Sequence, residues 1–264
     1  MADKRGRVLL VAASDSGGGA GIEGDIKTVT ALGGYGSTAI TALTAQNTLG
    51  VHGIFDIPPE FVAAQMRAVL GDIGTDAVKT GMFGRVGVVT AVCEVIEELG
   101  ADVPLVVDPV MVSTSGVALL DEVGIDCLKT RLLPMASLVT PNIPEAERLS
   151  GRNIGDLEGM GAAAADILAT GVGAVLVKGG HLPGDIMRDL LVWRGGEEIY
   201  EQPRIDTPHT HGTGCTLASA IATGLAQGLG LSDAVVRGRA YLQGAIGEAK
   251  GFGEGQGPLA HGFA

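Results

Sequence analysis

The chain has 264 residues, a length within the reach of one compact domain. Its 18 Lys and Arg against 30 Asp and Glu give a net charge of −12, which argues against a partner that requires a basic face, such as nucleic acid or an anionic membrane. Hydrophobic residues make up 46% of the chain and charged residues only 18%, which excludes a disordered chain and supplies a large core.

Short runs of Val, Ile and Leu alternate with longer amphipathic segments almost from end to end, as is typical of parallel strands connected by helices. The pattern from 187 to 203, with Gly195 and Gly196 at its centre, instead predicts a hairpin at an antiparallel edge. Strands are predicted over residues 7–14, 37–45, 76–80, 104–108, 137–140 and 173–178, and helices over 22–32, 59–70, 86–99, 117–132, 144–150, 157–170, 213–228 and 232–249.

These elements predict an α/β fold of three layers, a central and mostly parallel sheet flanked by helices. We expect a single domain over residues 1–264, in which the glycine-rich tail 251–264 is loosely ordered. The three cysteines are far apart in sequence and have no partners at metal-ligand spacing, which favours a reducing, cytoplasmic compartment. The apolar run at 8–13 is shorter than the core of a signal peptide.

Polar residues follow each of the predicted strands. Because ligands bind beyond the carboxyl ends of strands in open α/β sheets, these residues mark the expected site. Any single one of them is explained equally well by the polarity of loops, but the set as a whole indicates chemistry, and its two lysines suggest an anion such as phosphate. The set comprises Ser14 and Asp15, Gln46 and Asn47, Lys79 and Thr80, Asp108, Thr140 and Asn142, and Lys178.

A first glycine-rich loop at 19–24 matches the G-x-G-x-x-G pattern of dinucleotide-binding folds. Four residues separate it from the strand, however, and the second strand ends in Gln46 where a carboxylate is expected, so a Rossmann oxidoreductase is disfavoured. A P-loop is also lacking. The loop is either a plain turn or a close backbone approach to a small flat ligand, with Asp25 available as an acceptor.

A second glycine-rich loop, Gly212-Thr213-Gly214-Cys215-Thr216, opens a strongly apolar helix. Free N–H groups and the helix dipole make such a turn an anion site. A thiol at a helix N-terminus has a lowered pKa, so Cys215 is either a base or nucleophile, or an unreactive buried residue. His209 and His211 are interpreted only as polar loop residues.

Asn142 and Glu145 follow the strand at 137–140, on either side of Pro144. They are explained either as a helix cap with a carboxylate suited to the dipole, or, together with Asp108, as ligands of hydrated Mg²⁺ for phosphoryl transfer.

Seven motifs together resemble the ribokinase-like superfamily and, within it, the hydroxymethylpyrimidine and phosphomethylpyrimidine kinases of thiamine biosynthesis. The resemblance covers nearly the whole chain. Two departures, Ser16-Gly17-Gly18-Gly19 after Asp15 and Glu23-Gly24 in the following turn, leave the shape of the first loop open. The motifs are SDSGGGAGIEGDIKT, TALTAQNT, KTGMFG, VVDPVM, TPNIPEAE, VKGGH and HGTGCTLASAI, in the family's order.

The resemblance implies an ATP-dependent kinase that phosphorylates 4-amino-5-hydroxymethyl-2-methylpyrimidine and then its monophosphate, commonly as a homodimer. It implies that Cys215 is the catalytic base, that Gly212 and Gly214 frame an anion hole, and that Lys178 faces the ATP phosphates. Gln46, Asp25, Met82, Val110 and Gly21 would contact the pyrimidine, while Asp108, Asn142 and Glu145 would organise Mg²⁺.

Two other functions remain open from the sequence. A pyridoxine or pyridoxal kinase of the same superfamily acts on a similar heteroaromatic alcohol. A regulator that binds pyrimidine without catalysis would keep the fold, although the intact Cys215, Lys178 and Asp108 argue against it.

Overall fold

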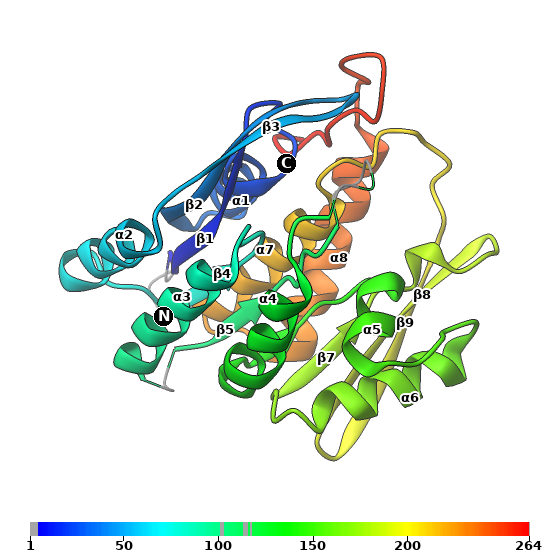
Figure 1. Cartoon of the computed structure of the whole chain (residues 1–264). Helices are drawn as coiled ribbons and strands as arrows, with labels where there is room; N and C mark the ends of the chain where they lie inside the picture. The colour runs from blue at the N-terminus through cyan, green and yellow to red at the C-terminus, as the bar shows by residue number, and fades with distance from the viewer. Residues whose placement is uncertain (1–4, 101–102, 113–115, 117, 264) are drawn as a thin grey trace.

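The computed structural model of the chain describes residues 5–100, 103–112, 116 and 118–263. This part of the chain forms one sheet of nine strands with helices on both faces, in the strand order β3-β2-β1-β4-β5-β6-β7-β8-β9 (Figure 1). The strands are β1 (Arg7–Asp15), β2 (Tyr35–Asn47), β3 (Gly50–Asp56), β4 (Ala77–Thr80), β5 (Leu105–Val107), β6 (Leu138–Val139), β7 (Ala174–Val177), β8 (Ile186–Trp193) and β9 (Gly196–Pro203).

The helices cover the sheet in two layers. Apolar residues of three helices share a core on one face, and those of five helices share a core on the other. The first layer contains α1 (Gly21–Ala31), α7 (Thr213–Ala226) and α8 (Leu231–Gly247); the second contains α2 (Pro59–Asp72), α3 (Val86–Leu99), α4 (Glu122–Cys127), α5 (Ile143–Ser150) and α6 (Leu157–Leu168). The predicted three-layer α/β fold is confirmed.

Strand β1 shows how the sequence builds both cores. Leu9 and Val11 point into the core of the five-helix layer, while Val8 and Leu10 point into the core of the three-helix layer. All four side chains are fully buried, which explains the continuous apolar run of a strand covered on both faces. β1 pairs in parallel with β2 and β4, so the carboxyl ends of these strands meet at one edge of the sheet.

The predicted hairpin is present as β8 and β9, with Arg194 and Gly195 between the paired residues Trp193 and Gly196. β3 was not predicted: it pairs antiparallel with β2 at the other edge. Its residues are largely exposed and include two glycines, so they lack the alternation by which a strand is recognised.

The helix predicted over 117–132 is shorter and irregular. Val117 lies outside the described residues. α4 begins at Glu122 because the side chain of Asp121 accepts a hydrogen bond from the Gly124 N–H and caps the helix. From Leu128 to Leu132 the chain continues as a π-helix, followed by a 3₁₀ turn.

The tail that was expected to be loosely ordered packs against the body of the molecule. Leu259 and His261 are buried, and the Tyr241 hydroxyl donates a hydrogen bond to the His261 carbonyl at 2.6 Å. The His261 ring also lies 3.0 Å from the Thr216 hydroxyl in the first turn of α7. Among the described residues, every helix is too short or too polar to cross a lipid bilayer.

Candidate active site

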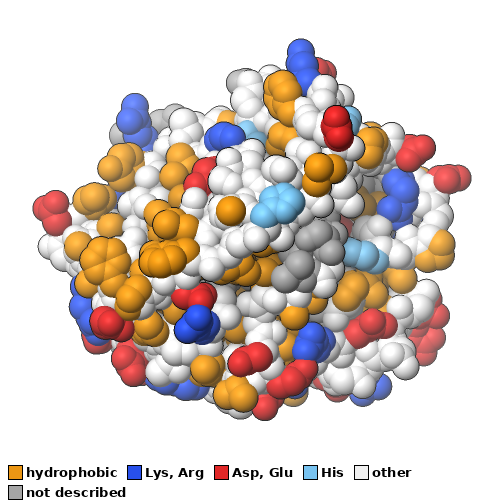
Figure 2. Space-filling model, turned by 45° about the horizontal axis from the view of Figure 1, so that its top comes forward, with side chains coloured by type: hydrophobic (Ala, Val, Ile, Leu, Met, Phe, Trp, Pro, Cys, Tyr) orange, Lys and Arg blue, Asp and Glu red, His pale blue; other side chains and the backbone are white. Residues whose placement is uncertain are grey.

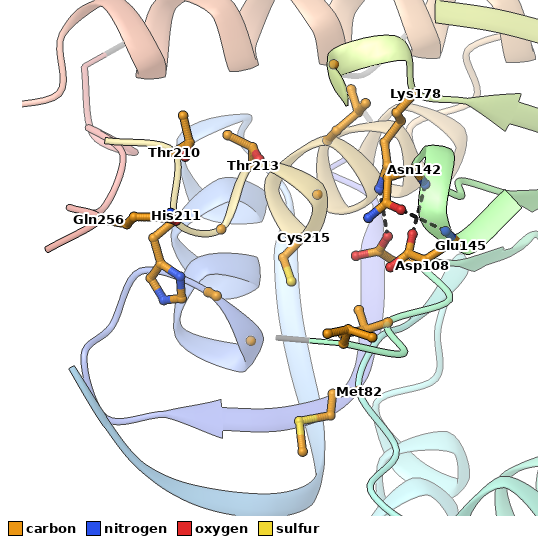
Figure 3. A pocket seen from close by; sticks show the side chains of 18 of the residues that line it. Met82, Asp108, Asn142, Glu145, Lys178, Thr210, His211, Thr213, Cys215 and Gln256 are labelled. Atoms are coloured by element: carbon orange, nitrogen blue, oxygen red, sulfur yellow. Dashed lines mark hydrogen bonds and ion pairs between the residues drawn. The ribbon is translucent and has the colours of Figure 1, made fainter. Parts of the chain in front are cut away.

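A cavity of about 740 Å³ lies at the carboxyl ends of the parallel strands, and its size is within the range of small-molecule sites. Side chains from one sheet edge and from the loops before α5 and α7 meet there (Figure 3). Eleven of the twelve predicted site residues line this cavity: Gly21, Gln46, Met82, Asp108, Val110, Asn142, Glu145, Lys178, Gly212, Gly214 and Cys215.

The N-terminus of α7 opens directly onto the cavity. Gly212 precedes the helix with a φ of +88°, and a Cβ at this position would lie 1.9 Å from the Gly19 carbonyl oxygen. Only glycine fits there, because it combines a left-handed backbone with contact between the two glycine-rich loops. The Thr213 N–H donates to the Thr210 carbonyl at 3.3 Å, but no side chain caps α7, so the next N–H groups, of Gly214 and Cys215, are available to an anion.

Cys215 stands in the first turn of α7, with its side chain directed into the cavity (Figure 3). Burial raises the pKa of the Cys215 thiol to about 12, against the opposing effect of Lys79. The expectation that the helix N-terminus lowers this pKa is therefore wrong, because loss of hydration outweighs the helix dipole. In the free protein at neutral pH the sulfur carries its proton.

Asp108 and Lys178 form an ion pair on the far side of the cavity from His211 (Figure 3). Lys178 Nζ lies 3.1 Å from Asp108 Oδ1, and the Thr140 hydroxyl donates to the same oxygen at 3.3 Å. Burial lowers the pKa of Lys178, but Asp108 and Glu145 outweigh it and leave this pKa raised. Lys178 is therefore a fixed positive charge at the end of β7.

Asn142 and Glu145 form a capping box at the start of α5. Asn142 Oδ1 accepts from the Glu145 N–H at 2.9 Å, and Glu145 Oε2 accepts from the Asn142 N–H at 2.8 Å. The interpretation as a helix cap is therefore confirmed. Burial raises the pKa of Glu145 to about 7, against the opposing effect of Lys178, and the charge of Asp108 raises it further.

The same residues fit a magnesium ion. Two buried carboxylates, Asp108 and Glu145, provide a place for a cation, since the charge of Asp108 raises the pKa of Glu145. Mg²⁺ in kinases takes one or two carboxylates and completes its shell with water and phosphate. Within the described ranges, no group of three or more His, Cys, Asp or Glu side chains is placed to hold a metal, so an ion bound there needs its other ligands from water and substrate.

Asp25 is the predicted site residue that the structure places elsewhere. It is fully buried beneath the cavity, where both carboxylate oxygens contact Lys79 Nζ at 2.8 and 2.9 Å and one accepts from the Ser219 hydroxyl at 2.7 Å. The prediction that it binds the pyrimidine is corrected: Lys79 is itself fully buried and requires a counter-ion. For the same reason, Lys79 does not offer its charge to an anion.

At the other end of the cavity, His211 joins two of the strand-end residues, Asp15 and Gln46, in a cluster that the sequence did not indicate. His211 Nε2 is 2.8 Å from Asp15 Oδ2 and 3.2 Å from the side-chain nitrogen of Gln46. His211 was interpreted only as a polar loop residue. Its partner Asp15 is 196 positions away in the sequence, and no local pattern connects the two residues.

Comparison with known proteins matches the chain to one family. Residues 15–260 match the family model described as phosphomethylpyrimidine kinase. The chain is 49% identical over 257 residues to a hydroxymethylpyrimidine/phosphomethylpyrimidine kinase of Streptomyces coelicolor, covering 97% of this chain and 94% of that one. It is 52% identical over 257 residues to the thiamine biosynthesis bifunctional protein ThiED of Geobacter sulfurreducens, covering 97% of this chain but only about half (52%) of the length of that relative.

Two solved structures are similar in fold. The phosphomethylpyrimidine kinase of Clostridium difficile matches with a TM-score of 0.81 and 40% identity, over 91% of this chain and 99% of that one. An ADP complex of Bacillus subtilis pyridoxal kinase matches with a TM-score of 0.89 and 33% identity, over 97% of each chain.

The three-layer fold, shared with these two solved kinases, places the chain among the kinases with the ribokinase-like fold. Within that class, the chain belongs to the phosphomethylpyrimidine kinase family.

Proposed function

We propose that this chain transfers the γ-phosphoryl group of ATP to the hydroxymethyl oxygen of 4-amino-5-hydroxymethyl-2-methylpyrimidine, and then a second one to the resulting monophosphate, as a step of thiamine biosynthesis. The names of the relatives and the matching family model support this substrate. The single observation that carries the proposal is the position of Cys215 between two sides of one cavity. The Lys178–Asp108 pair lies on one side, and Met82 and His211 lie on the other (Figure 3).

Each side of the cavity suits one substrate. Lys178, Gly212 and Gly214 supply an ammonium group and helix N–H groups, which favour the phosphates of ATP. Met82 and Val110 supply apolar surface for a heteroaromatic ring, while Gln46 offers an amide to ring nitrogens and Gly21 allows close approach of the first loop.

In the first transfer, the substrate oxygen forms a bond to the γ-phosphorus while the bond from that phosphorus to the bridging oxygen breaks, and ADP leaves. The proton of the alcohol passes to the Cys215 sulfur. Only the thiolate can accept it, so Cys215 must first release its own proton to solvent. Lys178 and the N-terminus of α7 stabilise the negative charge on the oxygens of the phosphoryl group during its transfer.

We further propose that Asp108, Glu145 and Asn142 hold Mg²⁺. When bound, this ion neutralises negative charge on the phosphates of ATP.

The second transfer uses a phosphate oxygen as the nucleophile. This oxygen is already ionised at neutral pH, so it has no proton for Cys215 to remove. The cavity volume of about 740 Å³ leaves room for the phosphorylated substrate.

Product analysis by mass spectrometry tests the proposal. With ATP, Mg²⁺ and the aminopyrimidine alcohol, the products should carry one and then two phosphoryl groups, with stoichiometric release of ADP. No ADP release that depends on the alcohol would overturn the proposed activity.

A second candidate is phosphorylation of pyridoxal. It is favoured by the similarity of the fold to the Bacillus subtilis pyridoxal kinase, at a TM-score of 0.89. Turnover of both alcohols under the same conditions separates the candidates. We expect a higher kcat/KM for the aminopyrimidine, since the sequence identity to phosphomethylpyrimidine kinases is higher.

We also propose that the chain acts as one domain in the cytoplasm, as a homodimer, and without a nucleic-acid partner. The single sheet supports one domain. The absence of disulfides among the described cysteines supports a cytoplasmic location, and the net charge of −12 argues against a nucleic-acid partner. Exposed apolar residues over α2, β2 and β3 support a homodimer, and Figure 2 shows apolar side chains gathered on this part of the surface. They are Leu43, Ile54, Phe55 and Phe61.

A further inference from the structure

The cluster of His211, Asp15 and Gln46 has no role in the transfer step. Asp15 accepts hydrogen bonds from three backbone N–H groups in and just before the first glycine-rich loop, those of Gly17, Gly19 and Ala20, at 2.8 to 3.1 Å. Burial alone would raise the pKa of Asp15, but hydrogen bonds from His211 and the loop outweigh it and leave this pKa lowered. Asp15 is therefore an ionised carboxylate that only accepts hydrogen bonds.

Because Asp15 Oδ2 can only accept and lies 2.8 Å from His211 Nε2, this ring nitrogen must carry a hydrogen. This holds for the neutral ring and for the imidazolium, so it does not depend on pH. The atom of Gln46 that faces the same nitrogen at 3.2 Å must then be an acceptor as well, since two donors would repel each other. A half-turn of the Gln46 amide, which exchanges its oxygen and nitrogen, gives the required arrangement.

Thr44 leads to the same orientation independently. Its hydroxyl donates its only hydrogen to the Ser14 carbonyl at 2.9 Å. The side chain of Gln46 lies 3.4 Å from the same hydroxyl, which has only lone pairs left to offer. After the half-turn, the amide nitrogen of Gln46 faces Thr44 and the amide oxygen faces His211, so both contacts become favourable.

We propose that His211, held by Asp15, and Thr44 fix the direction of the Gln46 amide, and that this fixed direction selects a ring edge with an amino donor beside a ring-nitrogen acceptor. The inference rests on the proposed function. Gln46 lines the cavity and presents one free N–H and one free lone pair. An aminopyrimidine offers the complementary pair of groups.

The corresponding oxopyrimidine offers the reverse order, a carbonyl acceptor beside a ring N–H donor. Gln46 could match it only by turning its amide back, which would set two donors against each other at His211 and lose the contact with Thr44. The substrate ring cannot turn over instead, because its hydroxymethyl group must face Cys215. His211 and Thr44 are therefore positioning residues that determine specificity through Gln46.

The test compares the 4-amino alcohol with its 4-oxo analogue in the full-length protein with ATP and Mg²⁺, measured by ADP release. The wild type should prefer the amino compound by about 100-fold or more in kcat/KM, since buried polar groups reject a mismatched partner strongly. In His211→Phe, which keeps a ring but has no donor, this preference should fall about tenfold, the size of one lost hydrogen bond, while the KM for ATP stays unchanged.

Two further variants separate positioning from structural damage. His211→Gln supplies an amide N–H where the ring nitrogen was and should restore the preference to within about threefold of the wild type. His52→Phe makes the same change at an exposed position on β3 and should leave the preference unchanged. A His211→Phe protein that keeps the full preference, or that loses ATP affinity in parallel, would overturn the proposal.

The proton on His211 provides a measurement that depends on neither substrate nor turnover. In the wild-type chain labelled with ¹⁵N-histidine, the signal that disappears in His211→Gln should show a hydrogen on Nε2 from pH 6 to 8. A bare Nε2 at pH 8 would refute the positioning role, even if the kinase activity is correct. Conversely, failure of the wild type to phosphorylate the amino alcohol, with Nε2 protonated, would refute only the proposed substrate.

Discussion

The buried pair of Lys79 and Asp25 allows a quantitative test of how the site is supported. Both side chains are fully buried, and the Ser219 hydroxyl donates to Asp25. Asp25→Asn keeps the shape and an acceptor for Ser219 but leaves Lys79 without a counter-ion. Breaking a buried ion pair in this way costs about 3 to 5 kcal/mol. For a chain of this size, the loss corresponds to a fall in Tm of roughly 6 to 20 °C.

The effect should also depend on pH. Burial lowers the pKa of Lys79, but Asp25 outweighs it and leaves this pKa above its ordinary value. In the wild type, the contribution of the Lys79 charge is therefore complete below the pKa of an unfolded lysine, about 10.4, and is lost as the pH rises through the higher pKa of the folded state. In Asp25→Asn, burial dominates and the pKa of Lys79 falls below the unfolded value. The unfolded state then binds more protons, so the stability of this variant rises with pH.

Urea unfolding at pH 6, 7, 8 and 9 measures both effects, and the difference between wild type and variant should narrow as the pH rises. Glu98→Gln is the matched control, since Glu98 and its partner Arg67 are about half exposed and the change should cost less than about 1 kcal/mol. Equal losses for the two variants, or a loss that is the same at every pH, would refute the reasoning. Replacing both partners, Asp25→Leu with Lys79→Met, should recover most of the stability.

Four further predictions concern catalysis. Cys215→Ala should slow the first transfer about 100-fold or more and the second much less, since only the first needs a base; equal residual rates in the two half-reactions would remove Cys215 from that role. In the wild type, kcat/KM for the first transfer should rise about tenfold per pH unit from pH 7 to 9, because the pKa of Cys215 is about 12 and the thiolate is the reactive form; a profile that is flat in this range would contradict this. Gly212→Ala should abolish both transfers, because the new Cβ would lie 1.9 Å from the Gly19 carbonyl oxygen. Gly33 also has a positive φ but no neighbour within 4 Å, so Gly33→Ala should only lower stability. Similar activities of the two variants would argue against the contact between the loops. Asp108→Asn should raise the Mg²⁺ concentration needed for half-maximal turnover about tenfold or more, and an unchanged metal titration would exclude Asp108 as a ligand.

Much of the fold and part of the site could be predicted from the sequence, because parallel strands bring their polar ends to one edge of the sheet. Asp108 and Lys178 directly follow β5 and β7, and Gln46 lies at the carboxyl end of β2, so the parallel arrangement brings all three to one cavity. Gly212 could be recognised as part of an anion site, because it belongs to a glycine-rich turn that opens a helix and the free N–H groups of such a turn bind anions.

Other parts of the site depend on contacts that a sequence does not display. The sequence predicted that Asp25 contacts the pyrimidine and that Lys79 attracts an anion. A single polar residue in a helix or at a strand end does not reveal whether it faces the ligand or the interior of the protein. In the structure, Asp25 and Lys79 face each other. The pKa of Cys215 was misjudged for a similar reason: its place at the start of a helix is visible in the sequence, but the burial that raises its pKa is not.

The charges around Cys215 explain why this kinase should need a cation. On the side where we propose that the nucleotide binds, two buried carboxylates, Asp108 and Glu145, lie near the ammonium group of Lys178. The pKa of Glu145 is raised because burial and Asp108 disfavour its charge. On the interior side, Lys79 is already neutralised by Asp25. Two arginines also line the cavity, but Arg148 is paired with Glu122 and Arg204 donates to three backbone carbonyls, so each already has partners within the protein. The cavity therefore has little positive charge to spare for a polyphosphate. If Asp108 holds a divalent cation as proposed, the ion would compete with Lys178 for this carboxylate, so metal binding and the alignment of Lys178 should depend on each other.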